Sequence, residues 1–108
     1  MSNYHPDAWV IIKITNNGVM YYKVLAGWYG GYANGDSWKI NSGITKVDKV
    51  DGVYEFSGYS GSSYFCHQSV ERLTGLTAGV LSSLQKDIET IGASIEVVPV
   101  SEVIEYFK

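Results

Sequence analysis

The feature that most constrains the fold of this chain is a β-hairpin close to its N-terminus. Residues 8–15 (AWVIIKIT) and 19–28 (VMYYKVLAGW) are rich in β-branched and aromatic side chains, which favour strands. Between them stands Asn16-Asn17-Gly18, a turn signal, because Asn and Gly accept positive φ angles. The two segments are therefore expected to pair as antiparallel strands.

Both faces of this hairpin are apolar, so each face needs a cover. Side chains alternate between the two faces of a strand, which sets Val10, Ile12 and Ile14 against Trp9 and Ile11. We expect a helix to cover one face and to leave the other partly bare. The residues assigned to that bare face are Trp9, Ile11, Tyr21 and Leu25. A symmetric homodimer would close it, whereas a sheet curled into a barrel or sandwich would bury both faces within one chain.

Further strands are expected along the first two-thirds of the chain and once near its end. Asp51-Gly52 lies between two alternating runs, and this dipeptide is typical of a type I′ hairpin turn. The predicted strands are residues 38–42, 45–50, 53–57, 63–67 and 95–98.

One amphipathic helix and one short helix complete the predicted elements. The apolar positions of the first recur at spacings of three and four residues, which is the helical period. These positions are Leu81, Leu84, Ile88 and Ile91. We expect Thr77 to cap this helix and Gly92 to end it. A short turn is expected at residues 69–73, and a C-terminal helix at residues 102–108, capped by Ser101.

These elements predict an α+β fold in a single domain, residues 1–108. It would consist of an antiparallel sheet of five to seven strands, one amphipathic helix and a short C-terminal helix.

Composition narrows the class of protein. No stretch approaches the roughly 20 apolar residues of a membrane span, and the N-terminus has no basic and apolar segments of a secretion signal. The lone Cys66 suits a reducing cytoplasm, and a packed structural thiol is favoured for it. The eight Lys and Arg residues are scattered and the formal net charge is -3, which disfavours nucleic-acid binding. We therefore expect a cytoplasmic protein without a membrane anchor.

Tyrosine, tryptophan and glycine are unusually frequent, with nine, three and twelve residues. These residues are typical of binding surfaces and equally of a turn-rich β domain. The richest segment is residues 27–44 (GWYGGYANGDSWKINSGI). Core anchoring is favoured for Trp28 and Trp38, and binding for the loop residues Tyr29 and Tyr32. The candidate binding residues are Trp28, Tyr29, Tyr32, Asp36, Trp38, Lys39, Asn41 and Tyr59.

Catalytic patterns fail when they are tested against the sequence. Cys66 and His67 are adjacent on a predicted strand, so they point to opposite faces and cannot act as nucleophile and base. Residues 58–62 (GYSGS) lack the last glycine of a nucleophile elbow. Asp48 and Glu55 would face each other across the Asp51-Gly52 hairpin, with Lys46 and Lys49 near enough to neutralise them, and a solvated hairpin is favoured over a metal site. We expect neither a metal nor a cofactor.

The segments above contain a pattern that resembles a group of small proteins encoded by tailed bacteriophages and prophages. The resemblance covers residues 5–67 and is carried by His5-Pro6, Trp9, Tyr22-Lys23-Val24, Gly27-Trp28, Gly30-Gly31-Tyr32, Ser37-Trp38-Lys39, Asn41-Ser42-Gly43-Ile44, Gly58, Ser60-Gly61, Tyr64 and Cys66-His67. It implies an accessory protein that works in the host bacterial cytoplasm. Such a protein would inhibit or sequester a component of host defence or metabolism.

Two functions follow as hypotheses. The leading one is a non-catalytic binding module that engages a host protein or a small nucleotide-like ligand through its aromatic, glycine-rich loop. The alternative is a small hydrolase or nuclease that uses Asp36, Lys39, Ser60 and His67. An enzyme is the less favoured of the two.

Overall fold

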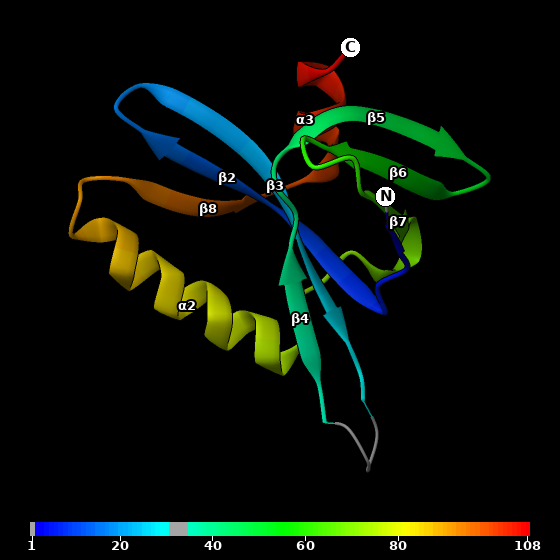
Figure 1. Ribbon diagram of the computed structural model, residues 1–108, viewed down its shortest axis with the longest axis horizontal. Coiled ribbons are helices and arrows are strands. Elements are labelled where there is room, and N and C mark those ends of the chain that lie inside the picture. Colours follow the sequence, from blue (N-terminus) through cyan, green and yellow to red (C-terminus); the bar gives the residue numbers. More distant parts are fainter. Residues whose placement is uncertain (1, 31–34) are drawn as a thin grey trace.

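The computed structural model describes residues 2–30 and 35–108, which form two sheets and two α-helices (Figure 1). The strands are β1 (Asn3–Tyr4), β2 (Ala8–Asn16), β3 (Val19–Trp28), β4 (Ser37–Ile40), β5 (Ile44–Val50), β6 (Val53–Gly58), β7 (Ser63–His67) and β8 (Ser94–Val98). The helices are α2 (Gly75–Glu89) and α3 (Val100–Tyr106), and a short 3₁₀ helix, η1 (Gln68–Val70), precedes α2. The predicted α+β class is confirmed.

The arrangement of the strands differs from the single sheet that the sequence predicts. The described residues form eight strands in two four-stranded sheets: the first sheet has the order β4-β3-β2-β8 and the second β1-β7-β6-β5. The unpredicted β1 runs parallel to β7, with Asn3 opposite Ser63. The chain crosses from the first sheet to the second between β4 and β5. Gly43 lies at this crossover with a φ of 129°, a conformation that other residues rarely adopt.

Both hairpin turns that the sequence predicts are present. Asn17 and Gly18 join β2 to β3 with φ angles of 52° and 77°, and Asp51 and Gly52 join β5 to β6 with 51° and 77°. Two successive residues with positive φ are the geometry of a type I′ turn. The second turn places Asp48 opposite Glu55, as expected from its two-residue length.

The chain itself covers both faces of the first sheet. On one face, α2 packs over a cluster that contains Val10, Ile12, Leu25, Leu81 and Ile95. On the other face, the second sheet and α3 close a larger cluster, which contains Trp9, Ile11, Val24, Phe56, Tyr64, Cys66 and Val103. Figure 1 shows α2 on one side of the β2–β3 hairpin and β5, β6 and β7 on the other. The sandwich alternative is therefore the one that this chain adopts.

The residues assigned to one bare face in fact lie on two different faces. Asn16 pairs with Val19, which puts Trp9 opposite Ala26 and Val10 opposite Leu25. Leu25 consequently shares the α2 face with Val10, whereas Trp9 is buried against the second sheet. Side chains alternate between the two faces along each strand. An error of one residue in the pairing register of the hairpin therefore assigns the side chains of one strand to the wrong face. The face that motivated a homodimer is already closed within the chain.

The helix boundaries also require corrections. α2 begins at Gly75 with Thr74 as its N-cap, and Thr77 instead occupies the third helical position. Its last helical residue is Glu89, so Ile91 lies beyond the helix and is 66% exposed, although Gly92 does mark the end with a φ of 75°. α3 begins at Val100 after Pro99, so Ser101 is not its cap. The turn expected at residues 69–73 is found as η1, at Gln68–Val70.

Among the described residues, none of the helices is both long enough and apolar enough to cross a membrane.

Candidate binding site

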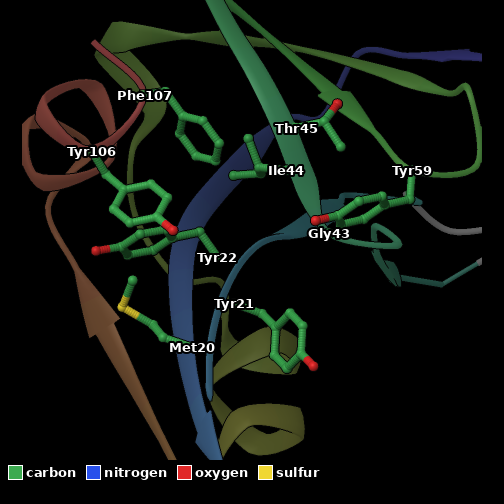
Figure 2. Close-up of a pocket in the computed structure, with 9 residues that line it drawn as sticks. All are labelled: Met20, Tyr21, Tyr22, Gly43, Ile44, Thr45, Tyr59, Tyr106 and Phe107. Atoms are coloured by element: carbon green, nitrogen blue, oxygen red, sulfur yellow. The ribbon is translucent and has the colours of Figure 1, made fainter. Parts of the chain in front are cut away.

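A pocket of about 330 Å³ opens where the start of β5 passes the edge of β3 and the end of α3. Figure 2 shows that tyrosine rings from three separate parts of the chain surround it, and we call it the tyrosine pocket. Its lining residues are Met20, Tyr21, Tyr22, Gly43, Ile44, Thr45, Tyr59, Tyr106 and Phe107.

The pocket lies beside a stretch of β3 that β4 does not reach. β4 pairs with β3 only from Leu25 to Trp28, whereas β2 pairs with β3 along its whole length. Asn41 extends the pairing by one step, because its N–H donates to the Val24 carbonyl and its Oδ1 accepts from the Val24 N–H at 2.9 Å. Past this point β3 forms an edge of the sheet, and Tyr21 and Tyr22, which point to opposite faces, both reach the pocket.

Hydrogen bonds between the β6–β7 connection and the β4–β5 crossover position Tyr59 beside the pocket. The Tyr59 N–H donates to the Gly43 carbonyl at 3.1 Å, and the Ser60 N–H donates to Ser42 Oγ at 2.9 Å. The Tyr59 ring lies so close to Gly43 that a β-carbon at residue 43 would be 2.9 Å from two ring carbons. A glycine is therefore required at this position both for its backbone angle and for the ring that covers it.

α3 supplies the opposite side of the pocket. Tyr106 meets the ring of Tyr22 edge-on at 5.2 Å between centroids, and Phe107 meets Tyr106 at 4.9 Å. In Figure 2 the rings of Tyr59 and Tyr106 stand on opposite sides, and their hydroxyl groups are directed toward the middle of the pocket.

Tyr22 is the buried tyrosine of the site, and a carboxylate holds its hydroxyl. The hydroxyl donates to Glu102 Oε2 at 2.7 Å, and Lys13 Nζ lies 3.6 Å from the same oxygen. Burial, followed by the hydrogen bond to Glu102 and its charge, raises the pKa of Tyr22 to about 12. Tyr22 is therefore a neutral hydrogen-bond donor at physiological pH and not a base.

The side chains of the lining are suited to binding a ligand and not to catalysing a reaction. It presents aromatic faces, phenol hydroxyls, one threonine hydroxyl and aliphatic carbon, and it includes no histidine, cysteine, lysine or carboxylate. Such a combination of apolar walls and a few polar groups is typical of ligand pockets. The described residues also contain no cluster of three or more metal-type side chains.

Of the eight residues predicted to bind, the structure places Tyr59 in the tyrosine pocket. Trp28 instead anchors the N-terminal segment: its Nε1 donates to the His5 carbonyl at 2.9 Å and its ring meets Tyr4 edge-on. Tyr29 is 51% exposed, and its N–H donates to Asp7 Oδ2. Asp36 accepts from the Gly30 N–H at 3.3 Å. Tyr32 lies outside the described residues.

The remaining predicted residues do not converge on one surface. Lys39 Nζ lies 5.2 Å from the centre of the Tyr4 ring on one side of β4. Trp38 points to the other side, beside Gly75 and Gly79 of α2, and is 45% exposed, so the core anchoring expected for it is wrong. Asn41 is only 5% exposed and bonds to Val24 as described, which gives it a structural position.

The residues of the enzymatic alternative are spread over the molecule. Ser60 lies in the connection before β7 and His67 is the last residue of β7, so the two are at opposite ends of this strand. Asp36 and Lys39 belong to the β4 region of the other sheet. His67 is exposed, and its Nδ1 contacts Ser69 Oγ at 2.7 Å. Cys66 is fully buried, and burial raises the pKa of its thiol, as expected for a packed cysteine.

Sequence reasoning missed most of the pocket. Tyr21 and Tyr22 were visible only as strand residues, and Tyr106 and Phe107 only as the end of a short helix. The high tyrosine count was the one available signal, and it does not say which tyrosines meet.

A scan against protein-family models finds no match, and searches of curated proteins and of solved structures find no similar protein.

Proposed function

We propose that this chain is a non-catalytic binding protein whose partner inserts a chemical group into the tyrosine pocket. The observation that carries the proposal is the convergence of five aromatic rings, from β3, the β6–β7 connection and α3, around a pocket of about 330 Å³. Small-molecule and side-chain pockets begin at about this volume. Aromatic anchors of this kind supply much of the free energy of binding at protein interfaces.

A protein is the better candidate for the partner than a nucleotide-like ligand. Phosphate groups are recognised by lysine, arginine or backbone N–H groups at a helix N-terminus. The lining of the tyrosine pocket includes neither basic residue, and the end of α3 that it contains is the C-terminal one. A phosphate in this pocket would lack a compensating charge.

The resemblance to small proteins of tailed phages implies a partner in the host bacterial cell. On this proposal the chain is an accessory protein that inhibits or sequesters a host component by occupying one of its surface groups. The glycine-rich loop at residues 29–37 remains a rival site for the same function, since it also exposes a tyrosine.

A pair of tyrosine variants separates the two sites. Tyr59→Ala removes an exposed ring of the pocket, and Tyr29→Ala removes an exposed ring of the loop, at 71% and 51% exposure. Both changes are expected to alter the free energy of unfolding by less than about 0.5 kcal/mol. A thermal-shift screen with amino-acid, nucleotide and amine ligands, followed by pull-down from host lysate, supplies the candidates.

We expect the affinity for the ligand or partner to be unchanged in Tyr29→Ala. In Tyr59→Ala we expect it to fall at least about tenfold. The opposite pattern would move the site to the loop. Silence of the wild-type chain in both the screen and the pull-down would contradict a binding function.

A further inference from the structure

We infer that the group held in the tyrosine pocket is an organic cation, the ammonium or guanidinium head of a basic side chain or small molecule. This inference rests on the proposed function and specifies the chemistry of its ligand. It is carried by the tyrosine rings and inward-pointing hydroxyls of the lining and by the carboxylate that accepts from Tyr22.

The aromatic lining favours a cation over an anion or a purely apolar group. The face of an aromatic ring carries negative electrostatic potential, so it attracts ammonium and guanidinium groups placed above it. Tyr59 and Tyr106 stand on opposite sides of the pocket, and Tyr22 meets Tyr106 edge-on. The hydroxyl groups of Tyr59 and Tyr106 point toward the middle of the pocket, so a cation bound between the two rings would lie close to both and could donate to their phenol oxygens.

Glu102 strengthens this preference through Tyr22. The Tyr22 hydroxyl donates to Glu102 Oε2 at 2.7 Å, and a hydrogen bond to a carboxylate shifts electron density toward the phenol ring. Lys13 compensates part of this charge, because its Nζ lies 3.6 Å from the same oxygen. Glu96, however, is the cross-strand neighbour of Lys13 on β8, and its negative charge also acts on Tyr22. The neighbourhood of Tyr22 retains an uncompensated negative charge.

No basic side chain of the lining competes for these groups. The nine lining residues include neither lysine nor arginine, and the formal net charge of the whole chain is -3. Long-range attraction and local contacts therefore favour the same sign of ligand.

Matched probes that differ only in charge test the inference. N-acetyl-arginine methylamide and its uncharged isostere, N-acetyl-citrulline methylamide, represent a basic side chain. Choline and its uncharged carbon isostere represent a free small cation. Each is titrated into the nitrogen-labelled full chain at constant ionic strength, and the amide resonances of Gly43, Thr45 and Tyr59 are followed by NMR.

We expect at least one cation to bind about tenfold more tightly than its neutral isostere, with shifts centred on these amides. Preference within the arginine pair would identify a basic side chain as the natural group, and preference within the choline pair alone a free ammonium. Equal affinity of the charged and neutral members of both pairs would overturn the cation inference and leave the pocket as a binding site.

Two glutamate variants locate the charge effect. Glu102→Gln keeps an acceptor for Tyr22 but removes the negative charge, and is expected to reduce the cation preference several-fold. Glu105→Gln is the matched control on α3, because its carboxylate pairs with Lys108 and not with the pocket tyrosines. An equal effect of both variants would indicate general attraction by the chain and contradict the role of Glu102.

Absence of binding by all four probes would also overturn the inference, whereas the proposed function fails only if the ligand screen and pull-down fail as well.

Discussion

Single residues at the crossover between the two sheets determine the shape of the tyrosine pocket. Gly43 turns the chain and leaves space for the Tyr59 ring. Asn41, two residues earlier, replaces a missing strand residue: its backbone N–H and side-chain Oδ1 bond to both polar groups of Val24. The Nδ2 of Asn41 is buried without a hydrogen-bond partner. Asn41 therefore satisfies the polar groups of Val24 at the edge of β3 but leaves its own amide nitrogen unpaired.

We expect Asn41→Ala to lower the free energy of unfolding by about 1–3 kcal/mol, because the Val24 N–H would be left buried and unpaired. Urea denaturation measures this change. Lys39→Ala, at an exposed position of β4 two residues before Asn41, serves as the control and should change stability by less than about 0.5 kcal/mol. If Asn41→Ala were as stable as this control but weakened partner binding, its originally expected binding role would be restored.

At the scale of elements, α2 owes its start to a reciprocal pair of threonines. Thr74 Oγ1 accepts from the Thr77 N–H at 3.0 Å, and Thr77 Oγ1 accepts from the Thr74 N–H at 2.7 Å. This is a capping box in which threonine takes the place of the usual Glu or Gln. Both side chains are buried against Gly27 of β3, where a β-carbon would lie 3.1 Å from each methyl group. The cap therefore also fixes where α2 meets the first sheet.

Thr74→Ala is expected to destabilise the chain by about 1–2 kcal/mol, since it removes the cap and part of this contact. Ser101→Ala tests the residue that the sequence predicts as the N-cap of α3. It should have little effect, because α3 begins after Pro99 without a side-chain cap. Thermal denaturation of the two variants compares them directly, and equal destabilisation would contradict the boundary of α3.

At the scale of the whole molecule, the second sheet buries the apolar face that a second copy of the chain was expected to bury. Trp9 and Ile11 are buried by β6, β7 and α3 of the same chain. The pocket forms at the margin of this contact, between strands of both sheets and the end of α3. Its existence thus depends on how the β4–β5 crossover and α3 bring the two sheets together.

The fold removes the exposed face on which the expected homodimer was based. Sedimentation equilibrium at micromolar concentration tests for the homodimer. Because both faces of the first sheet are covered, we expect a single species of 11.9 kDa. A species of twice that mass would restore the dimer and require an interface elsewhere.

Local features of this chain were determined by its sequence. The two type I′ turns follow from Asn-Gly and Asp-Gly, because these residues accept positive φ angles at little cost. The long strands of the first hairpin follow from β-branched and aromatic runs, and α2 follows from its helical spacing. Each depends on interactions between residues near one another in the chain. The burial of Cys66 was also predictable, since free cysteine behaves as a small apolar residue.

Only the tertiary structure decided how the strands divide into sheets and which tyrosines meet. The strand patterns are compatible with one sheet or two, because the alternation of side chains says that a face must be buried but not what buries it. Tyr22, Tyr59 and Tyr106 are far apart in sequence and come together through the crossover at Gly43 and the docking of α3. Packing over such separations depends on the complementary shapes of distant surfaces, which no local pattern encodes.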